Sequence, residues 1–416
     1  MHIAVLVQDF PPETGAGPAR ISELADAWLA AGHKVSVLTG FPNRRLPGRP
    51  DGTIPPEYRG HLFMRETWRG IDVYRSWLFS SSRRGFATTL VNNLTFAISS
   101  FLYGLRSLPR PDILIASGPP YFAQFAGAGI AGLRGIPLIL EIRDLWPDYI
   151  AEMKVIRSAP LLRAVFASER WLLRRASAVV VVTDAFRRRM IAKGVAPAAI
   201  TVIPNGVDLS RYFPADERAP IEALEHREPS EHVVGYIGTF GAGQGLGALI
   251  DATRRLRARG LNVRTVMVGD GPHRSVLEAE LRSMPDDGVR MHPPIPRDDT
   301  RAFYSACDVV VVPHAALSVL GETVPSKIFE VMACGRPLVA ALQGEGARIV
   351  QESGAGVLAS PGSGESLADA IERVIAMSDG ERAALGTAGR AFAALHYDRA
   401  QLAVKYLAVL EMVAEA

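Results

Sequence analysis

Short apolar runs alternate with longer mixed segments along most of the chain, beginning with Ile3–Val7. An uninterrupted apolar run of about four to eight residues is typical of a strand buried on both faces of a sheet. Strand–helix alternation predicts a parallel sheet with helices on its faces. The expected strands are 3–7, 34–39, 71–75, 112–116, 137–142, 178–182, 200–203, 233–237, 265–269, 308–313 and 337–340, and the expected helices are 18–31, 86–105, 121–133, 161–174, 184–193 and 400–413.

Two segments break this alternation. Residues 41–70 are rich in Pro, Arg and Gly and show no periodicity, so we expect a long loop that is either functional or an idle insertion. Residues 211–232 are polar and contain prolines, which is typical of a linker between domains. Because 416 residues exceed the size of one ordinary hydrophobic core, the chain is expected to contain two domains.

The composition indicates a globular protein of a reducing compartment. Apolar residues make up 48% of the chain, charged residues 21%, and the net charge is +3. Cys307 and Cys334 both lie in apolar context, which favours buried thiols and a cytoplasmic location. No Cys/His cluster has metal-ligand spacing, so we expect neither a metal nor a cofactor. The N-terminal apolar run is too short for a signal peptide, and the basic patches lack the interleaved aromatic residues of a nucleic-acid binder.

The segment from Glu322 to Glu330 has features of a ligand site. It follows an apolar strand, and Pro325 and Gly335 suit the start and end of a short helix. The N–H groups and dipole at a helix start attract phosphate, and Lys327 could add a positive charge there. Glu330, roughly 8 Å further along the axis, could accept both hydroxyls of a ribose. Taken alone, the pattern favours two solvated carboxylates beside a core helix over a ligand site.

Four motifs together resemble the retaining glycosyltransferases of family 4, which have the GT-B fold. They are E-x7-E followed by M-A-C-G-x-P-L-V, the segments Ile203–Asp208 and Val268–Pro272, and the loop Gly15–Gly17. The resemblance implies an α/β architecture of two Rossmann-like domains with a nucleotide-sugar cleft between them and a C-terminal helix crossing back. The implied division is 1–210 (acceptor domain), 211–232 (linker), 233–395 (nucleotide-sugar domain) and 396–416 (a helix packing back toward the acceptor domain).

The resemblance assigns roles to matching residues. Glu322 would lie against the donor sugar, and Glu330 would hold the ribose. Gly15, Gly17 and the backbone amides of residues 323–327 would face the donor diphosphate. Ile295 lies in the segment whose backbone pairs with the base.

Two cations that most of the family use to clamp the diphosphate are missing. Thr239, after Gly238, stands in the place of an arginine, and Gln244 stands in the place of a lysine. Lys327 is the expected replacement, because it belongs to the helix start that faces the same diphosphate. The alternative is that the site has lost its activity.

A further departure falls after the expected strand 137–142. Many members have His-Asp there, whereas this chain has Arg143 and Asp144. Asp144 is therefore equally expected to act on the acceptor or to cap local structure. The full set of expected site residues is, as catalytic residues, Glu322, Asp144 and Lys327, and as substrate-binding residues, Gly15, Gly17, Gly238, Thr239, Ile295, Thr323, Val324, Ser326, Glu330 and Arg143.

The resemblance implies transfer of a sugar from a nucleotide sugar, with UDP preferred, to a glycan acceptor with retention of configuration. Pro325-Ser326-Lys327 resembles the branch that transfers acetamido sugars such as fucosamine in O-antigen, lipopolysaccharide and exopolysaccharide assembly. The alternatives are a nucleotide-sugar epimerase of related fold and a non-catalytic nucleotide-sugar-binding module.

Arginines cluster on both sides of the apolar stretch 86–105. Polar residues interrupt that stretch, so we expect a surface-lying or core-packed helix rather than one that spans a membrane. A basic, apolar first domain would suit a polyprenyl-diphosphate-linked saccharide as acceptor. The enzyme would then bind peripherally to the anionic surface at the inner face of the cell membrane. The alternative is a packed helix with solvated arginines.

Overall fold

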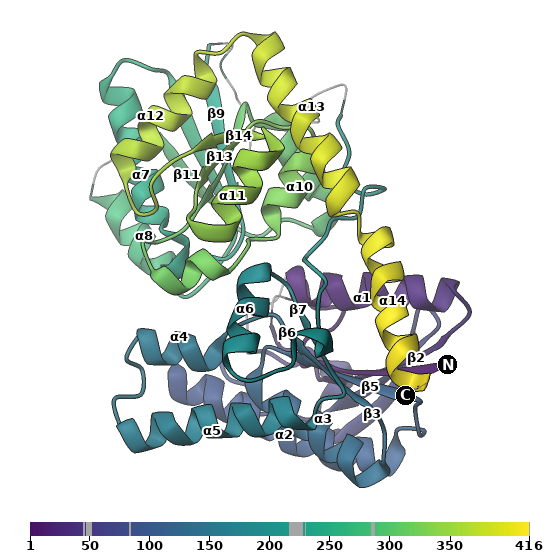
Figure 1. Cartoon of the computed structure of the whole chain (residues 1–416). Coiled ribbons are helices and arrows are strands. Elements are labelled where there is room, and N and C mark those ends of the chain that lie inside the picture. The colour runs from purple at the N-terminus through teal and green to yellow at the C-terminus, as the bar shows by residue number, and fades with distance from the viewer. Residues whose placement is uncertain are drawn as a thin grey trace. The chain divides into compact units, whose positions relative to one another are not determined.

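The computed structural model describes residues 1–44, 46, 52–82, 85–215, 228, 230–283 and 288–415. The chain divides into two compact units, of which unit 1 comprises Met1–Pro204 and Arg399–Ala416, and unit 2 comprises Asn205–Asp398 (Figure 1). Unit 2 is thus inserted into the sequence of unit 1.

Unit 1 is built on an eight-stranded sheet, counted over its described residues. Every neighbouring pair is parallel except β3 and β4, which form an antiparallel pair. The strand order is β3-β4-β2-β1-β5-β6-β7-β8, with bounds β1 (His2–Leu6), β2 (Lys34–Gly40), β3 (Phe63–Trp68), β4 (Ile71–Ser76), β5 (Ile113–Gly118), β6 (Leu138–Ile142), β7 (Ala178–Val181) and β8 (Ile200–Val202).

The expectation of an irregular loop over residues 41–70 is wrong in its second half. A short 3-10 turn (Pro56–Tyr58) leads into β3, which is the edge strand beside β4. The side chains of β3 alternate between exposed and half-buried, so the strand lacks the continuous apolar run of a central strand. Residues 45 and 47–51 of this segment lie outside the described residues.

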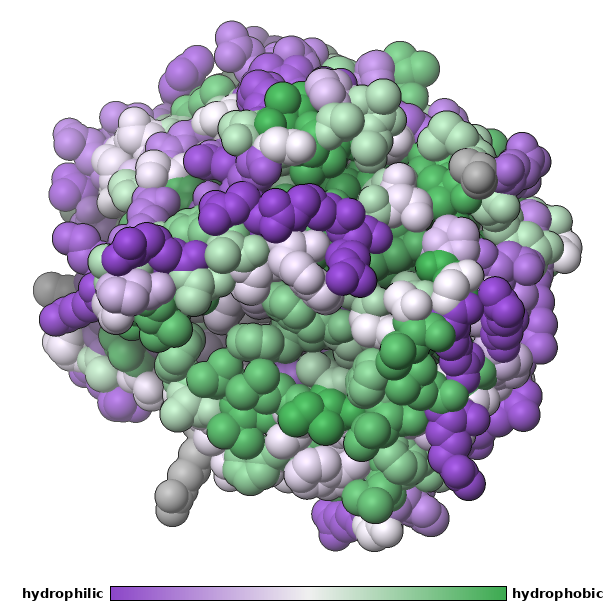
Figure 2. All heavy atoms as spheres, turned by 60° about the horizontal axis from the view of Figure 1, so that its bottom comes forward, coloured by the Kyte–Doolittle hydropathy of each residue, from purple (hydrophilic) through white to green (hydrophobic). Residues whose placement is uncertain are grey.

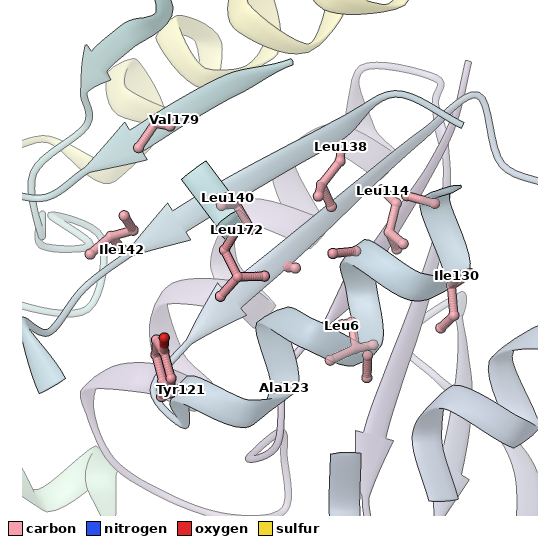
Figure 3. Close-up of a cluster of buried hydrophobic side chains, with 14 of the residues drawn as sticks. Leu6, Leu114, Tyr121, Ala123, Ile130, Leu138, Leu140, Ile142, Leu172 and Val179 are labelled. Atoms are coloured by element: carbon pink, nitrogen blue, oxygen red, sulfur yellow. The ribbon is translucent and has the colours of Figure 1, made fainter. Parts of the chain in front are cut away.

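Successive residues of a strand point to opposite faces of the sheet. In unit 1 both faces carry buried apolar residues, and helices cover both. One core lies under α2 (Phe86–Ser107), α3 (Tyr121–Arg134), α5 (Ala159–Arg175) and α6 (Asp184–Ala192), and it contains alternate strand residues such as Leu6 and Leu114 (Figure 3). The opposite core lies under α1 (Ala16–Ala30) and the C-terminal helix α14 (Arg399–Glu415), and it contains Ile3 and Val5. A short helix not expected from the sequence, α4 (Trp146–Glu152), follows β6.

Unit 2 repeats the design with a six-stranded parallel sheet in its described residues. The order is β11-β10-β9-β12-β13-β14, with bounds β9 (His232–Ile237), β10 (Val263–Val268), β11 (Val289–His292), β12 (Val309–Pro313), β13 (Leu338–Ala341) and β14 (Gly356–Leu358). Its helices are α7 (Leu246–Ala258), α8 (Arg274–Arg282), α9 (Thr300–Ala306), α10 (Lys327–Ala333), α11 (Gly344–Ser353), α12 (Gly364–Ile375) and α13 (Asp379–His396).

The segment expected as a linker, 211–232, is described only in part, since residues 216–227 and 229 lie outside the described residues. Its first residues belong to unit 2, because Tyr212 is buried in the core of that unit and Arg211 pairs with Asp298. The chain passes from unit 1 to unit 2 between Pro204 and Asn205.

A buried ion pair connects the helices, sheet and chain crossing of unit 1. Arg20 of α1 donates from Nε to Glu141 of β6 at 3.0 Å, and both side chains are essentially unexposed. The same guanidinium donates to the carbonyls of Ile203 and Pro204, where the chain leaves the unit. Burial alone would raise the pKa of Glu141, but Arg20, Arg143 and a hydrogen bond from Ser117 outweigh it and lower the pKa. This pair therefore contributes stability above the ordinary pKa of a glutamate, and the contribution is lost as the pH falls through the lowered value.

We expect Glu141→Gln to lower the free energy of unfolding by roughly 3–5 kcal/mol, because the guanidinium groups of Arg20 and Arg143 then stay buried without their counter-charge. Urea denaturation followed by circular dichroism measures the change. Glu411→Gln makes the same substitution at an exposed position of α14 and should leave the midpoint where it is. Equal midpoints for Glu141→Gln and the wild type would show that the carboxylate is not needed.

Candidate functional site

In unit 2, the expected site residues other than Ile295 follow the carboxyl ends of β9 and β12, which are neighbours in the sheet, and Ile295 follows β11. Loops at this edge of a parallel α/β sheet are the usual place for a ligand. The chain leaves β12, makes a 3-10 turn (Ser318–Glu322) and enters α10 at Lys327. Pro325 was expected in the first turn of this helix, but it precedes the N-terminal cap, Ser326, and its carbonyl accepts from the N–H of Ile328.

Lys327 carries its ammonium group to the end of β9. Its Nζ lies 4.2 Å from the ring centroid of Tyr236. A Cβ added at Gly238 would lie 2.5 Å from the same Nζ and would displace the ammonium group, and the φ of +148° at Gly238 favours glycine. Burial lowers the pKa of Lys327 to about 8, although the nearby charge of Glu330 raises it in part. The structure thus places a cation beside the Gly238–Thr239 turn, next to the position where the family arginine is missing.

The loop after β10 closes on this turn. A Cβ at Gly269 would lie 1.9 Å from the carbonyl oxygen of Gly238, and Gly269 has a φ of +149°. The hydroxyl of Tyr236 donates to the carbonyl of Thr239 at 2.8 Å, and this hydrogen bond stabilises the turn. The glycine at position 269 therefore lets the backbone after β10 approach the backbone of Gly238 closely. The hydrogen bond from Tyr236 holds Thr239 in place.

Glu330 lies on α10 and accepts a hydrogen bond from Tyr304 of α9 at 2.8 Å. Burial, followed by the charge of Glu330, raises the pKa of Tyr304 well above its ordinary value, so Tyr304 stays a donor. Burial also raises the pKa of the Cys334 thiol to about 12, with a smaller contribution from Glu330, and this thiol is neutral. The tyrosine holds the carboxylate in one orientation.

Glu322 ends the 3-10 turn before α10 and is half-buried. This turn is held against the loop after β9, since a Cβ at Gly243 would lie 3.6 Å from the side chain of Leu320. Thr323 donates from its hydroxyl to the carbonyl of Leu320 at 3.0 Å, so its side chain serves the turn. Val324 and Ile295 are partly buried and pack against the same core of unit 2.

The sequence did not single out His314, the residue directly after β12. His314 is 4% exposed, and no hydrogen bond reaches its Nδ1 from the described residues. Burial and, to a smaller extent, the charge of Lys327 together lower its pKa to about 4, so the imidazole is neutral at pH 7. Its place at the end of a strand was the signal that could have found it. No such signal marks Tyr236 or Tyr304.

In unit 1, the expected residues gather at the start of α1 and the end of β6. Gly15 caps α1 with a φ of +122°, and a Cβ at Gly17 would lie 3.0 Å from a guanidinium nitrogen of Arg143. Arg143 donates from Nε to Ser117 at 3.0 Å and lies 3.4 Å from Glu141. Asp144 follows β6, where partial desolvation raises the pKa of its carboxyl, while the N–H of Leu145 and the charge of Arg143 lower it in part. This edge of unit 1 combines a helix start with a cation.

No group of three or more His, Cys, Asp or Glu side chains that could hold a metal ion occurs in the described part of the chain. The two sites present ammonium and guanidinium groups, carboxylates, a neutral imidazole and backbone N–H groups. In unit 2, a cation and an oriented carboxylate lie on the same short helix, α10. Groups of these two kinds can bind an anion and hydroxyl groups respectively.

Comparison with known proteins agrees with this arrangement. Residues 15–206 match a family model described as a glycosyl transferase 4-like domain, and residues 231–377 match one described as glycosyl transferases group 1. The 2-deoxystreptamine glucosyltransferase of Streptomyces kanamyceticus is 28% identical over 65% of this chain and 69% of its own. The colanic acid biosynthesis glycosyl transferase WcaI of Escherichia coli is 26% identical over 80% of this chain and 82% of its own.

A solved structure shares the fold over the full length. The Anabaena protein HepE, determined with UDP-glucose, superposes with a TM-score of 0.70 at 20% identity, covering 99% of this chain and 100% of that one. Both units thus have the Rossmann-like α/β architecture of the GT-B fold. The motifs, the two matched domains and the fold together show that the chain belongs to the family 4 retaining glycosyltransferases.

Proposed function

We propose that the enzyme transfers a sugar, in particular an acetamido sugar, from a UDP-sugar to a lipid-linked glycan acceptor in surface polysaccharide biosynthesis. The observation that carries the donor half of this proposal is the position of the Lys327 ammonium group, which lies against Gly238. Lys327 and Glu330 belong to the same helix, α10. The sequence lacks both diphosphate-clamping cations of the family pattern, and Lys327 supplies a charge beside the first of their positions.

The donor is bound by unit 2 in this proposal. Its diphosphate accepts hydrogen bonds from the ammonium group of Lys327, from backbone N–H groups of Val324, Ser326 and Lys327, and from the hydroxyl of Thr239. Its ribose hydroxyls donate to Glu330, whose carboxylate Tyr304 orients. Preorganised donors aimed at the leaving group are the largest contribution to catalysis of this kind. Glu322 lies against the sugar, and His314 offers a neutral ring to one of its hydroxyls.

The acceptor is bound by unit 1. Arg143, which Ser117 and Glu141 hold in place, provides a positive charge at the edge of its sheet, and Asp144 follows it. In the transfer step the bond between the anomeric carbon and the diphosphate oxygen breaks, and the acceptor oxygen attacks the same face of the sugar. Because the acceptor attacks the face from which the diphosphate departs, the configuration at the anomeric carbon is retained. The departing diphosphate takes the proton of the acceptor hydroxyl.

Three similarities support the choice of substrates. The Anabaena structure holds UDP-glucose, which favours UDP as the nucleotide. The Escherichia coli relative carries a name from colanic acid biosynthesis, which favours a polysaccharide product. The Pro325-Ser326-Lys327 sequence resembles the branch of the family that transfers acetamido sugars. A cytoplasmic enzyme acting at the inner face of the cell membrane fits a polyprenyl-diphosphate acceptor.

A thermal-shift screen against UDP, GDP and ADP sugars, followed by transfer assays with short-chain polyprenyl-diphosphate saccharides, tests the proposal. UDP-linked acetamido sugars should raise the melting temperature most, and one of them should be consumed only when an acceptor is present. A GDP-sugar as the sole ligand would overturn the nucleotide assignment. Transfer to free oligosaccharides but not to lipid-linked ones would overturn the acceptor assignment.

We expect Lys327→Ala to raise the donor KM or lower kcat by at least roughly tenfold, because a charge-assisted contact to the diphosphate is lost. Initial rates measured over a range of donor concentrations separate the two effects. Lys405→Ala removes the same side chain at an exposed position of α14 and should behave like the wild type. An unchanged rate for Lys327→Ala would show that another group replaces the missing cations.

The pKa of about 8 for Lys327 predicts a pH dependence of donor binding. The ammonium form dominates below that pH and is lost above it, so kcat/KM for the donor should fall by about tenfold per pH unit on the alkaline side. Lys327→Arg should move this decline to higher pH, because a guanidinium remains charged. A pH–rate profile of both proteins makes the comparison, and coincident alkaline limbs would exclude Lys327 as their source.

Glu330→Gln should weaken UDP binding by roughly tenfold, since a hydrogen bond to a charged acceptor contributes about 1.5–3 kcal/mol. Tyr304→Phe removes only the group that orients Glu330 and should have a smaller effect of the same sign. Isothermal titration with UDP measures both, and Glu365→Gln, at an exposed position of α12, is the matched control. Wild-type affinity in Glu330→Gln would remove this carboxylate from the ribose site.

A further inference from the structure

The helix α2 of unit 1 has an apolar outward face. Its buried face carries Asn92, Asn93, Ser99 and Ser100 together with Phe96 and Tyr103, and further apolar side chains face outward. The exposed fractions on the outward face are 50% for Phe86, 43% for Val91, 37% for Leu94, 61% for Ile98 and 54% for Leu102. The outward positions from 91 onward recur at helical spacing, so they form one continuous stripe. A surface helix ordinarily shows the opposite pattern.

Polar residues of the buried face of α2 form hydrogen bonds with loops of unit 1. Asn92 donates to the carbonyl of Phe79 at 2.6 Å and accepts from Gln8 and Arg44, each at 2.7 Å. Thr95 accepts from the N–H of Phe79 at 2.9 Å. Gln8 and Arg44 lie in the loops after β1 and β2, at the same edge of the sheet as Arg143. Asn92 and Thr95 are therefore hydrogen-bonded inside the unit, and the apolar stripe faces outward.

The stripe continues across the neighbouring helices α3 and α5. Phe101 of α2 lies against α3, since a Cβ at Gly129 would be 2.8 Å from its ring. Phe125 of α3 stacks on Trp171 of α5 with ring centroids 6.0 Å apart. Leu133 of α3 is 70% exposed, and Leu161 of α5 is 50% exposed. Figure 2, which brings the lower part of Figure 1 forward, shows a broad apolar area bordered by hydrophilic residues.

The charges on these three helices have one sign at the surface. All residues of α2, α3 and α5 are described, and the single acidic residue among them, Glu169, is buried and paired with Lys193. The exposed charged residues are Arg106, Arg163, Arg170, Arg174 and Arg175. Arg175 lies over the ring of Trp171 at 4.8 Å, and such aromatic–basic pairs suit the interface between a bilayer and water.

We propose that the stripe on α2, together with the arginines of α2 and α5, docks unit 1 on an anionic lipid bilayer. An apolar face rimmed by cations matches the acyl chains and the anionic headgroups of such a surface. A second copy of the chain fits less well, because symmetric pairing through this face would bring the same arginines together. Within the described residues, no helix is both long enough and apolar enough to cross a bilayer.

The purpose of this docking surface rests on the proposed function, in which the acceptor is lipid-linked. Docking through α2 would bring the bilayer surface to the element that holds the loops after β1 and β2. A lipid-linked acceptor could then reach the edge of the unit 1 sheet without leaving the membrane. The docking itself needs neither donor nor acceptor, so it is measured separately from transfer.

Sedimentation of the full-length protein with vesicles of phosphatidylcholine and phosphatidylglycerol tests the proposal, with pure phosphatidylcholine vesicles alongside. The wild type should bind the anionic vesicles at low salt, less at high salt, and pure phosphatidylcholine weakly. The double variant Ile98→Glu/Leu102→Glu should lose at least tenfold in vesicle affinity. Val404→Glu/Met412→Glu adds the same charges at positions of α14 that are 70% and 55% exposed, and it should bind like the wild type.

Circular dichroism melts establish that both double variants are folded, and UDP affinity measured by isothermal titration should be equal in both. No binding of the wild type to anionic vesicles would overturn the proposal. Equal binding by Ile98→Glu/Leu102→Glu would also overturn it. A wild-type dimer that Ile98→Glu/Leu102→Glu converts to a monomer, without vesicle binding, would assign the face to a second copy. Vesicle binding by a protein that cleaves no donor would reject the proposed function and leave the docking surface standing.

Discussion

The approach of the Lys327 ammonium group to Gly238 is the constraint on which the unit 2 site depends. A side chain at position 238 would push Nζ away from its present place. Tyr236 holds the turn that follows through a hydrogen bond to the carbonyl of Thr239, and Gly269 packs against the same turn. The same helix start that positions Lys327 positions Glu330 one turn later. Movement of α10 would therefore displace the cation and the carboxylate together, so the two can act only as a unit.

The lowered pKa of Lys327 shows the cost of this arrangement. A partly desolvated amine beside an aromatic ring is less stable as an ammonium than one in water. The structure retains it because Glu330 offsets part of that cost. A ligand that brings negative charge would stabilise the ammonium form further, which makes the site selective for anions. An arginine in the usual family position would remain charged without such help.

Much of the fold was predictable because central strands of a parallel sheet are continuous apolar runs. Strands such as β1, β9 and β12 lie within a residue or two of their expected bounds. The edge strand β3 was missed because only one of its faces is covered, so its pattern is weak. In the site, Lys327 was identified because a known pair of cations was absent from the sequence. Tyr304 was not, because its contact with Glu330 depends on the packing of α9 against the sheet and leaves no local pattern.

The insertion of unit 2 into unit 1 has a consequence for biosynthesis. The core of unit 1 beside α1 includes Leu402, Tyr406 and Leu410 of α14, and Trp28 meets Tyr406 edge-on at 5.4 Å. A ribosome makes these residues after all of unit 2. Part of the apolar surface of the nascent unit 1 therefore stays uncovered while the strands and helices of unit 2 are already complete. Translation that stalls between unit 2 and α14 would yield a protein with one finished unit and one that chaperones must protect.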